Sequence, residues 1–437
     1  MARKVFISFL GTGNYVQTYY QFGKEKPVKP VRFIQEALLD HIQEQFDEDS
    51  KIFIFCTEKA RKINWKDNGQ SLISEEIEKK GLEGILLEKP YGKYVKMVPI
   101  EEGFSEDEVW LIFDAVYNEL KDGDSVYFDV THAFRSIPMF STILFNFAHF
   151  TKKIKIEEVF YGAFEKLGFA SAVRMLPIEE RIAPVIDLSS MIELQNLTSV
   201  AANFIDYGKV GKIGDAFDNN EDKSFNRLIC KLKADSSKLE EYILLNKADK
   251  ISEGLFADDI NGQIKRLLKN EHTTSAQKEI LKQLKAQLGP FKRNGNEMNI
   301  CAAVEWALKY DMIQQAYTLA EELIITLVCK SLENKSFYNL YEEDEQLKWR
   351  NYISRLLAIK PKDVKEKNYQ YELSENAVLT GELLNKETIK LLKQSYIRLS
   401  NNRNVLCHGK KTDKSLERFK SELKEDFAYL FETSKCL

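Results

Sequence analysis

An arginine and a histidine near the carboxyl end of the sequence have types and a spacing that could cleave a phosphodiester. They lie in "RLSNNRNVLCHG" as Arg403 and His408, with Asn404 between them. Histidine moves protons near neutral pH, and a guanidinium stabilises charge on phosphoryl oxygens. The 2′-OH of RNA would be the nucleophile, so no metal-activated water is needed and DNA should not be cut. Arg403, His408 and Asn404 are therefore the candidate catalytic residues.

The spacing of these two residues is awkward on one helix. Five residues at about 100° each place Arg403 and His408 about 140° apart. Three explanations stay open: the arginine stem reaches around, the helix is distorted near Asn401-Asn402, or the partner side chain comes from a second chain. A purely structural role also stays open, in which His408 interacts with the helix dipole just before Gly409 as the C′ residue.

No metal site accompanies this pair. The sequence has no HExxH motif, no clustered acidic pair and no Cys/His quartet, so we predict no metal for catalysis. The six cysteines are scattered without a C-x-x-C pair, which is typical of a protein in a reducing cytoplasm. No stretch approaches the roughly 18 apolar residues of a membrane span.

Length and charge limit the classes of protein that remain. A chain of 437 residues predicts two to three domains. The 63 basic and 67 acidic residues give a net charge of −4, which argues against a protein that coats polyanions through its overall charge. Contact with nucleic acid must then come from local patches.

The elements that must position the candidate residues differ between the two halves. In the first 185 residues, "KVFISFL", "KIFIFC", "YVKMVPI", "DSVYFDV" and "IKIEEVFYGAF" are β-strand patterns, and helical patterns alternate with them. This alternation predicts an α/β, Rossmann-like domain, with a mainly parallel sheet and helices on both faces. The remainder is helical and rich in Lys, Glu and Leu. We predict a first domain at 1–185, a helical connector at 186–300 and an all-α domain at 301–437.

A glycine pair follows the first strand. In "FLGTGN", Gly11 and Gly13 would let a backbone approach a phosphate, and successive N–H groups can bind an anion. A third glycine at dinucleotide spacing is absent, and the next segment, "YVQTYYQFGKEKPVKP", favours a hairpin-like excursion over a helix. A nucleotide-dependent oxidoreductase is therefore disfavoured. A tight turn at the strand exit is the structural alternative.

A second polar cluster follows the fourth predicted strand. In "FDVTHAFRSIP", Asp129, Thr131, His132 and Arg135 crowd the strand end and the start of the next helix. An arginine can bind a phosphate or a base in a fork. The carboxyl ends of parallel strands are where ligands bind, and both clusters should share that edge. The alternative is structural: Thr131 or Ser136 caps the helix, and Asp129 pairs with Arg135.

"GTGNY" and "DVTHAFRSIP" together resemble the CARF sensor domain of CRISPR-associated ribonucleases, over roughly residues 1 to 185. The resemblance implies a homodimer that binds a cyclic oligoadenylate, for which we favour cyclic tetra-adenylate. A two-fold ligand suits a two-fold interface. The implied ligand contacts are Gly11, Thr12, Gly13, Asn14, Thr131, His132 and Arg135.

"RNVLCH" resembles the R-x4-H motif of HEPN ribonucleases, which lies late in an all-helical domain. The family assembles Arg and His of two protomers into one composite site, which would ease the spacing of Arg403 and His408. With the CARF-like motifs, it implies an activated, metal-independent endoribonuclease of type III CRISPR antiviral defence. It would cut single-stranded RNA to a 2′,3′-cyclic phosphate. The alternative is a non-catalytic sensor whose helical half binds a partner protein.

Overall fold

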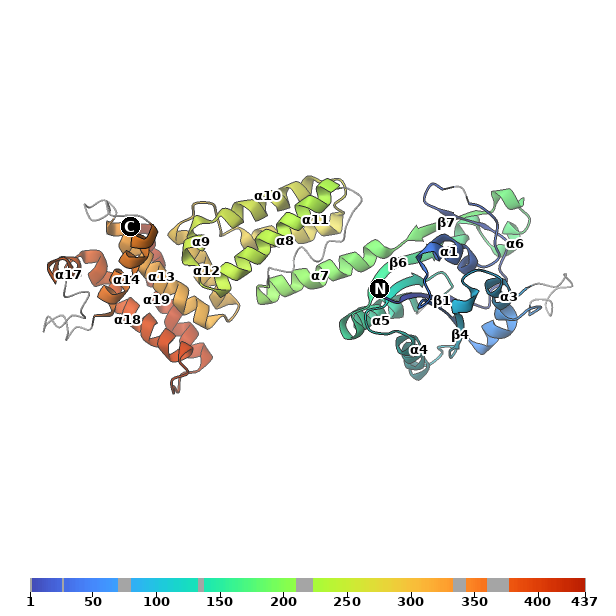
Figure 1. Cartoon of the computed structure of the whole chain (residues 1–437), viewed down its shortest axis with the longest axis horizontal. Helices are drawn as coiled ribbons and strands as arrows, with labels where there is room; N and C mark the ends of the chain where they lie inside the picture. Colours follow the sequence, from blue (N-terminus) through green and yellow to red (C-terminus); the bar gives the residue numbers. More distant parts are fainter. Residues whose placement is uncertain are drawn as a thin grey trace. The chain divides into compact units, whose positions relative to one another are not determined.

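The chain consists of two compact units, Met1–Glu193 and Leu194–Leu437, seen in a computed structural model (Figure 1). The structure describes residues 2–25, 27–69, 80–132, 137–209, 223–332, 343–359 and 377–436. The boundary between the units falls inside helix α7 (Ser189–Tyr207). The predicted division at residue 300 falls inside α12 (Glu297–Lys309), and a connector separate from a nuclease domain stays a prediction.

A seven-stranded sheet forms the centre of the first unit, with the strand order β2-β7-β6-β5-β1-β3-β4. All neighbouring pairs are parallel except β6 and β7. The strands are β1 (Lys4–Leu10), β2 (Tyr19–Phe22), β3 (Lys51–Cys56), β4 (Val95–Pro99), β5 (Ser125–Asp129), β6 (Lys155–Gly162) and β7 (Ile182–Asp187). The helices longer than one turn are α1 (Ile34–Ile42), α3 (Leu82–Leu87), α4 (Glu106–Glu119) and α5 (Ile137–Lys152), and the short α2 (Glu58–Ala60) and α6 (Ala170–Val173) complete the unit.

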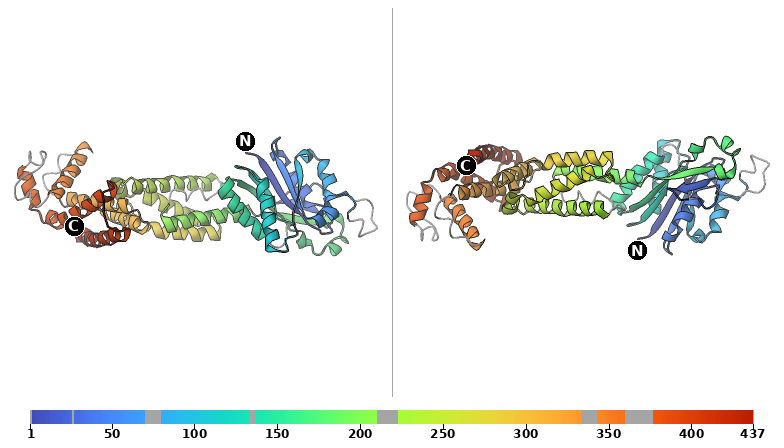
Figure 2. Two further views of the ribbon diagram at one scale, coloured as in Figure 1. Left: turned by 90° about the horizontal axis from the view of Figure 1, so that it is seen from below. Right: turned by 90° about the horizontal axis from the view of Figure 1, so that it is seen from above.

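Each face of the sheet is buried under its own pair of helices. Alternate residues of β1 enter different cores: Phe6 packs with α1 and α3, whereas Val5 and Ile7 pack with α4 and α5. Burial on both faces explains why the central strands are continuous apolar runs. Figure 2 shows helices on both sides of the sheet. The predicted fold class, a mainly parallel α/β unit followed by an all-α unit, is confirmed.

The segment between β1 and α1 is the hairpin-like excursion that the sequence predicted. Thr18 and Val31 exchange two backbone hydrogen bonds, of 2.9 Å and 3.0 Å, across an antiparallel bridge. Two strands were not predicted. β2 is only four residues long, and β7 contains Pro184, which normally argues against a strand with neighbours on both sides.

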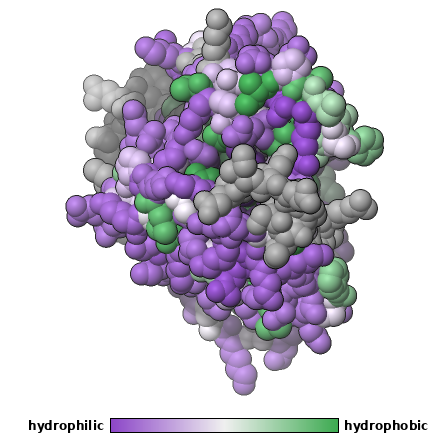
Figure 3. All heavy atoms as spheres, turned by 90° about the vertical axis from the view of Figure 1, so that its right-hand side faces the viewer, coloured by the Kyte–Doolittle hydropathy of each residue, from purple (hydrophilic) through white to green (hydrophobic). Residues whose placement is uncertain are grey.

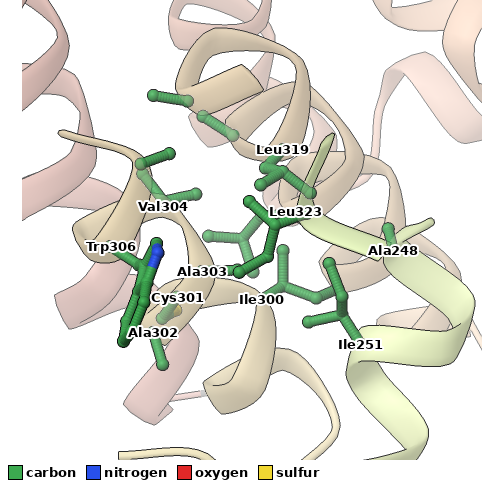
Figure 4. Close-up of a cluster of buried hydrophobic side chains, with 14 of the residues drawn as sticks. Ala248, Ile251, Ile300, Cys301, Ala302, Ala303, Val304, Trp306, Leu319 and Leu323 are labelled. Atoms are coloured by element: carbon green, nitrogen blue, oxygen red, sulfur yellow. The ribbon is translucent and has the colours of Figure 1, made fainter. Parts of the chain in front are cut away.

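The regular secondary structure of the second unit is entirely helical in its described residues. A continuous core runs from Leu197 to Leu430, and α12 and α13 are packed closely within it. Figure 4 shows Ile300 and Val304 of α12 beside Leu319 and Leu323 of α13. Beyond α7 and α12 its helices are α8 (Lys223–Leu244), α9 (Ala248–Glu253), α10 (Leu255–Lys269), α11 (Ser275–Leu288), α13 (Ile313–Leu332), α14 (Glu343–Ala358), α17 (Ala377–Leu384), α18 (Glu387–Cys407) and α19 (Leu416–Cys436).

The surface is expected to be largely hydrophilic, because 30% of the residues in the sequence are charged. On the face drawn in Figure 3 hydrophilic side chains predominate, and hydrophobic ones gather only in small groups. Among the described residues, no helix is both long and apolar enough to cross a membrane.

Gly254 and Gly262 allow a matched test of the helical unit. Gly254 joins α9 to α10 with a φ of +66°, and a Cβ there would strike the Lys292 carbonyl oxygen. Gly262 lies within α10 in open space. We expect Gly254→Ala to lower the free energy of unfolding by more than about 1 kcal/mol. Gly262→Ala should raise it by up to about 1 kcal/mol, because alanine favours helix. Urea unfolding monitored by circular dichroism measures both, and equal effects would contradict the assigned geometry.

Candidate functional site

The two polar clusters of the first unit lie at one edge of the sheet. β1 and β5 are parallel neighbours with Ser8 opposite Asp129, so the loops that follow them leave the sheet side by side. Apart from β2, which lies at the far edge of the sheet, the chain builds outward from β1 through β3 and β4, and then returns to the other side of β1 with β5 and β6. Such a reversal of strand order opens a crevice where ligands bind in α/β sheets. We call this region the ligand edge: residues 11–14 and 131–132.

Asn64 holds the first loop of the ligand edge in place. Its side-chain amide donates to the carbonyl oxygens of Gly11 (2.8 Å) and Gly13 (3.0 Å). Asn64 is buried on a π-helical turn, Arg61–Trp65, soon after β3. Thr12, Gly13 and Asn14 are exposed. The loop is therefore tethered from beneath while its outer side remains accessible to a ligand. The sequence interpretation did not include Asn64.

Tyr15 and His132 join the two loops. Their ring centroids lie 4.3 Å apart, and the Gly11 backbone hydrogen-bonds the Tyr15 hydroxyl. Burial raises the pKa of Tyr15, and burial lowers the pKa of His132 to about 4, so the imidazole is neutral at pH 7. His132 Nε2 is buried without a hydrogen-bond partner among the described residues. An unsatisfied nitrogen of this kind is costly, and a bound ligand could satisfy it.

A buried carboxylate lies beneath the ligand edge. Asp129 accepts hydrogen bonds from the Ser8 hydroxyl (2.7 Å) and the Thr131 backbone N–H (2.9 Å), and Gln35 of α1 donates to Ser8 (3.0 Å). Burial raises the pKa of Asp129. The Thr131 hydroxyl accepts from the Gly162 N–H of β6 (2.8 Å). The network fixes the ends of both strands. Arg135, the predicted phosphate contact, and Ser136 lie outside the described residues.

At the candidate catalytic site, α18 is unbroken past Asn401-Asn402, so a distorted helix does not explain the spacing of Arg403 and His408. Asn402 has a structural role, because its side-chain amide donates hydrogen bonds to the Tyr317 hydroxyl (3.1 Å) and to the Glu422 carboxylate (2.9 Å). His408 is the C-cap of α18, exposed to solvent.

The end of α18 is closed by backbone hydrogen bonds. The His408 N–H donates to the Asn404 carbonyl (3.2 Å), and the Lys410 N–H donates to the Val405 carbonyl (3.2 Å). Gly409 has a φ of +57°, as expected for a C′ glycine. The imidazole therefore leaves the helix at its last turn and projects from a well-formed terminus.

Arg403 is held by two neighbours. Its Nε lies 3.2 Å from Glu321 Oε2 of α13, and its Nη2 donates to Asn404 Oδ1 at 3.1 Å. The Arg403 side chain is 35% exposed, whereas the Glu321 side chain is 6% exposed. Burial raises the pKa of Glu321 to about 7, although Arg403 and hydrogen bonding by Ser400 oppose that shift. Arg403 and Asn404 are thus brought together.

No group of three or more His, Cys, Asp or Glu side chains that could hold a metal ion occurs in the described ranges. The side chains that meet near the end of α18 are instead a guanidinium, an amide and a carboxylate, and the His408 imidazole lies exposed at the C-cap. Such a set suits binding of an anion and transfer of a proton.

Comparisons with known proteins give a sequence relative and related solved structures. Over 202 residues the chain is 29% identical to CRISPR-associated protein MJ1674 of Methanocaldococcus jannaschii. The match covers 43% of this chain and 28% of that relative, so the chain spans less than a third of the relative's length. Enterococcus italicus Csm6 bound to cyclic hexa-2′-fluoro-hexa-dAMP aligns over 99% of this chain and 93% of its own, with a TM-score of 0.46 and 12% identity. No family model matches. The predicted resemblance to CRISPR-associated proteins is confirmed by the sequence relative.

The buried Glu321 predicts a pH dependence of stability. A glutamate with a pKa near 4.5 when unfolded and about 7 when folded binds its proton more tightly in the folded state. Its contribution to stability is full below pH 4.5 and is lost as the pH rises to 7. Glu321→Gln lacks this loss. Between pH 4 and pH 8, the stability of the wild type relative to the variant should fall by up to about 3 kcal/mol. Urea unfolding across this range tests it, and parallel pH profiles would refute it.

Proposed function

We propose that this chain is an endoribonuclease of type III CRISPR antiviral defence, activated by a cyclic oligoadenylate. The observation that carries the proposal is the pairing, in one chain, of a ligand edge at a sheet switch point with an exposed His408 and a tethered Arg403 at the end of one helix. The motifs at both places resemble CARF and HEPN proteins, and a sequence relative is a CRISPR-associated protein.

At the ligand edge, a ring of phosphates and adenines would meet the loop at residues 11–14 together with Thr131, His132 and Arg135. His132 is neutral at pH 7, so it can hydrogen-bond or stack but contributes no positive charge. Arg135 and backbone N–H groups must then compensate the negative charge of the phosphates. We propose a homodimer that shares one ring, with cyclic tetra-adenylate as the favoured activator. For the ligand to activate, it must bind the active arrangement more tightly than the inactive one.

At the end of α18, the reaction is an intramolecular displacement on RNA. The 2′-oxygen attacks the adjacent phosphorus, the bond to the 5′-oxygen breaks, and a 2′,3′-cyclic phosphate remains. His408 transfers the proton, which passes from the 2′-OH to the leaving 5′-oxygen over the complete reaction. Arg403 stabilises the charge on the phosphoryl oxygens, and Asn404 orients Arg403. A second copy would supply the matching pair of side chains. The substrate is single-stranded RNA in the cytoplasm, and no metal takes part.

The first test is cleavage of single-stranded RNA in EDTA, with cyclic tetra-adenylate or cyclic hexa-adenylate as activator. We expect the tetra-adenylate to stimulate cleavage, the product to carry a 2′,3′-cyclic phosphate, and DNA of the same sequence to stay intact. His408→Ala and Arg403→Ala should each lower the rate by about 10²–10⁴-fold. His272→Ala, at an exposed histidine of the same unit, is the matched control. If His408→Ala cleaves as fast as the wild type, the ribonuclease assignment is wrong and a non-catalytic sensor remains.

The second test concerns activator affinity. Asn64→Asp keeps the shape of the side chain but removes the N–H donors that hold the Gly11 and Gly13 carbonyls. We expect the loop to shift and the dissociation constant for the activator to rise at least about tenfold, the cost of one lost hydrogen bond to a buried group. Calorimetry measures the constant. Asn203→Asp, at an exposed asparagine of α7, is the control. Unchanged affinity in Asn64→Asp would place the ligand elsewhere.

A further inference from the structure

We propose that Glu321 is a positioning residue for Arg403, one that acts on the reaction through the guanidinium without touching RNA. The inference rests on the proposed function, because it assigns Arg403 a part in RNA cleavage. Glu321 lies in α13, a helix whose interior face is packed into the core of the second unit. Four further observations support it.

The first observation is that a carboxylate occupies a position suited to an apolar side chain. Glu321 lies between Leu319 and Leu323 on α13, both of which are fully buried. Its own side chain is 6% exposed, and its Oε1 has no hydrogen-bond partner in the described part of the chain. Burying a carboxylate is expensive, and apolar side chains in place of buried ion pairs often leave proteins equally stable or more stable. Stability alone therefore gives no reason for a glutamate here.

The second observation is that different nitrogen atoms of the Arg403 guanidinium have different surroundings. Glu321 lies 3.2 Å from Nε, and Asn404 accepts from Nη2. Nε is buried without a hydrogen-bond partner among the described residues, so Glu321 meets it as an ion pair, and about a third of the Arg403 side chain is exposed. The inner side of the guanidinium thus faces a carboxylate and an amide oxygen of the protein, while part of the side chain reaches solvent. A fixed, planar fork is the form in which arginine binds phosphates with least loss of entropy.

The third observation is that the two helices that hold this pair are packed against each other. Both belong to the core of the second unit, where Leu323 of α13 and Leu399 of α18 have no solvent exposure. The Tyr317 hydroxyl of α13 also accepts from Asn402 of α18. The distance between Glu321 and Arg403 is therefore set by packing, so the carboxylate can hold the guanidinium at one place.

The fourth observation is a neighbouring ion pair that provides a control. Glu322 follows Glu321 on α13 but pairs with Arg350 of α14, with 2.6 Å between Oε2 and Nη2. Both side chains are about a third exposed. Glu322→Gln therefore removes a glutamate charge from the same turn without removing a neighbour of Arg403.

The experiment compares Glu321→Gln, Glu321→Met and Glu322→Gln in the activated cleavage assay. We expect both Glu321 variants to lower kcat by about 10- to 100-fold, because small displacements of a catalytic group have effects of that size, with KM unchanged within about twofold. Glu322→Gln should cleave like the wild type. Circular dichroism should show Glu321→Met folded under the assay conditions, because its side chain is apolar and similar in size to glutamate, although the loss of one partner of the ion pair lowers its urea midpoint. A folded but slow Met variant supports positioning, and a folded and fast one overturns it.

A double-variant series separates this role from a merely structural one. In an Arg403→Gln background, Glu321→Gln should lower kcat no further, because the group that it positions is gone. Equal losses in both backgrounds would overturn the inference.

Failure of the proposed function itself remains distinguishable. If the wild type is inactive on RNA with every activator, urea unfolding of the wild type, Glu321→Gln, Arg403→Gln and the double variant still tests whether Glu321 and Arg403 interact. The midpoint shifts of Glu321→Gln and Arg403→Gln should then be non-additive, because each removes the same ion pair. Additive shifts would show that Glu321 does not hold Arg403.

Discussion

A buried carboxylate lies behind each candidate site, and the cost of burying it shapes the structure around it. Desolvation disfavours the ionised form, so such a group persists only where nearby donors or cations compensate. Asp129 obtains a hydroxyl and a backbone N–H, whereas Glu321 obtains a guanidinium and a hydroxyl. In each case one compensating group, the Thr131 N–H or the Arg403 guanidinium, belongs to the segment that would meet the ligand or the substrate. The requirement to satisfy a carboxylate in the core thereby fixes the position of groups at the surface.

Most of the first unit could be predicted from sequence because its strands are buried on both faces. β3 and, apart from Ser8, β1 are runs of apolar, β-forming residues after an initial lysine, and such runs are hard to mistake when helical patterns alternate with them. β2 and β7 lack that signal. β2 has one buried residue in four, and β7 has a proline and three exposed residues in six. Their pairing depends on the excursion that brings Thr18 against Val31, which is a tertiary contact without a local pattern.

Each candidate site likewise has a part that the sequence predicted and a part that it did not. The loops after β1 and β5 were predictable, because parallel strands end at one edge whatever their order. The role of Asn64 was not predictable, because its side chain reaches the loop after β1 from the turn that follows β3. The partner of Arg403 was not predictable either, because α13 carries two adjacent glutamates, Glu321 and Glu322. The helical phase decides: Glu321 faces α18, and Glu322 faces Arg350 of α14. Adjacent residues on a helix point about 100° apart, so the choice depends on packing that only the fold reveals.

The unbroken α18 limits what one copy of the chain can do. Arg403 is turned toward α13 and tied there, and His408 lies a further turn along, where the helix ends and Gly409 takes a positive φ. The tether to Glu321 leaves the arginine stem little freedom to swing around the helix, so of the three explanations for the spacing, reach by Arg403 is the one most restricted. A guanidinium and an imidazole that cannot share a face of one helix can still converge when two copies of that helix lie against each other, because in a two-fold interface a residue of one copy can meet a different residue of the other, and the reverse contact repeats it. The same ion pair that fixes Arg403 therefore favours a composite site over a site within a single chain.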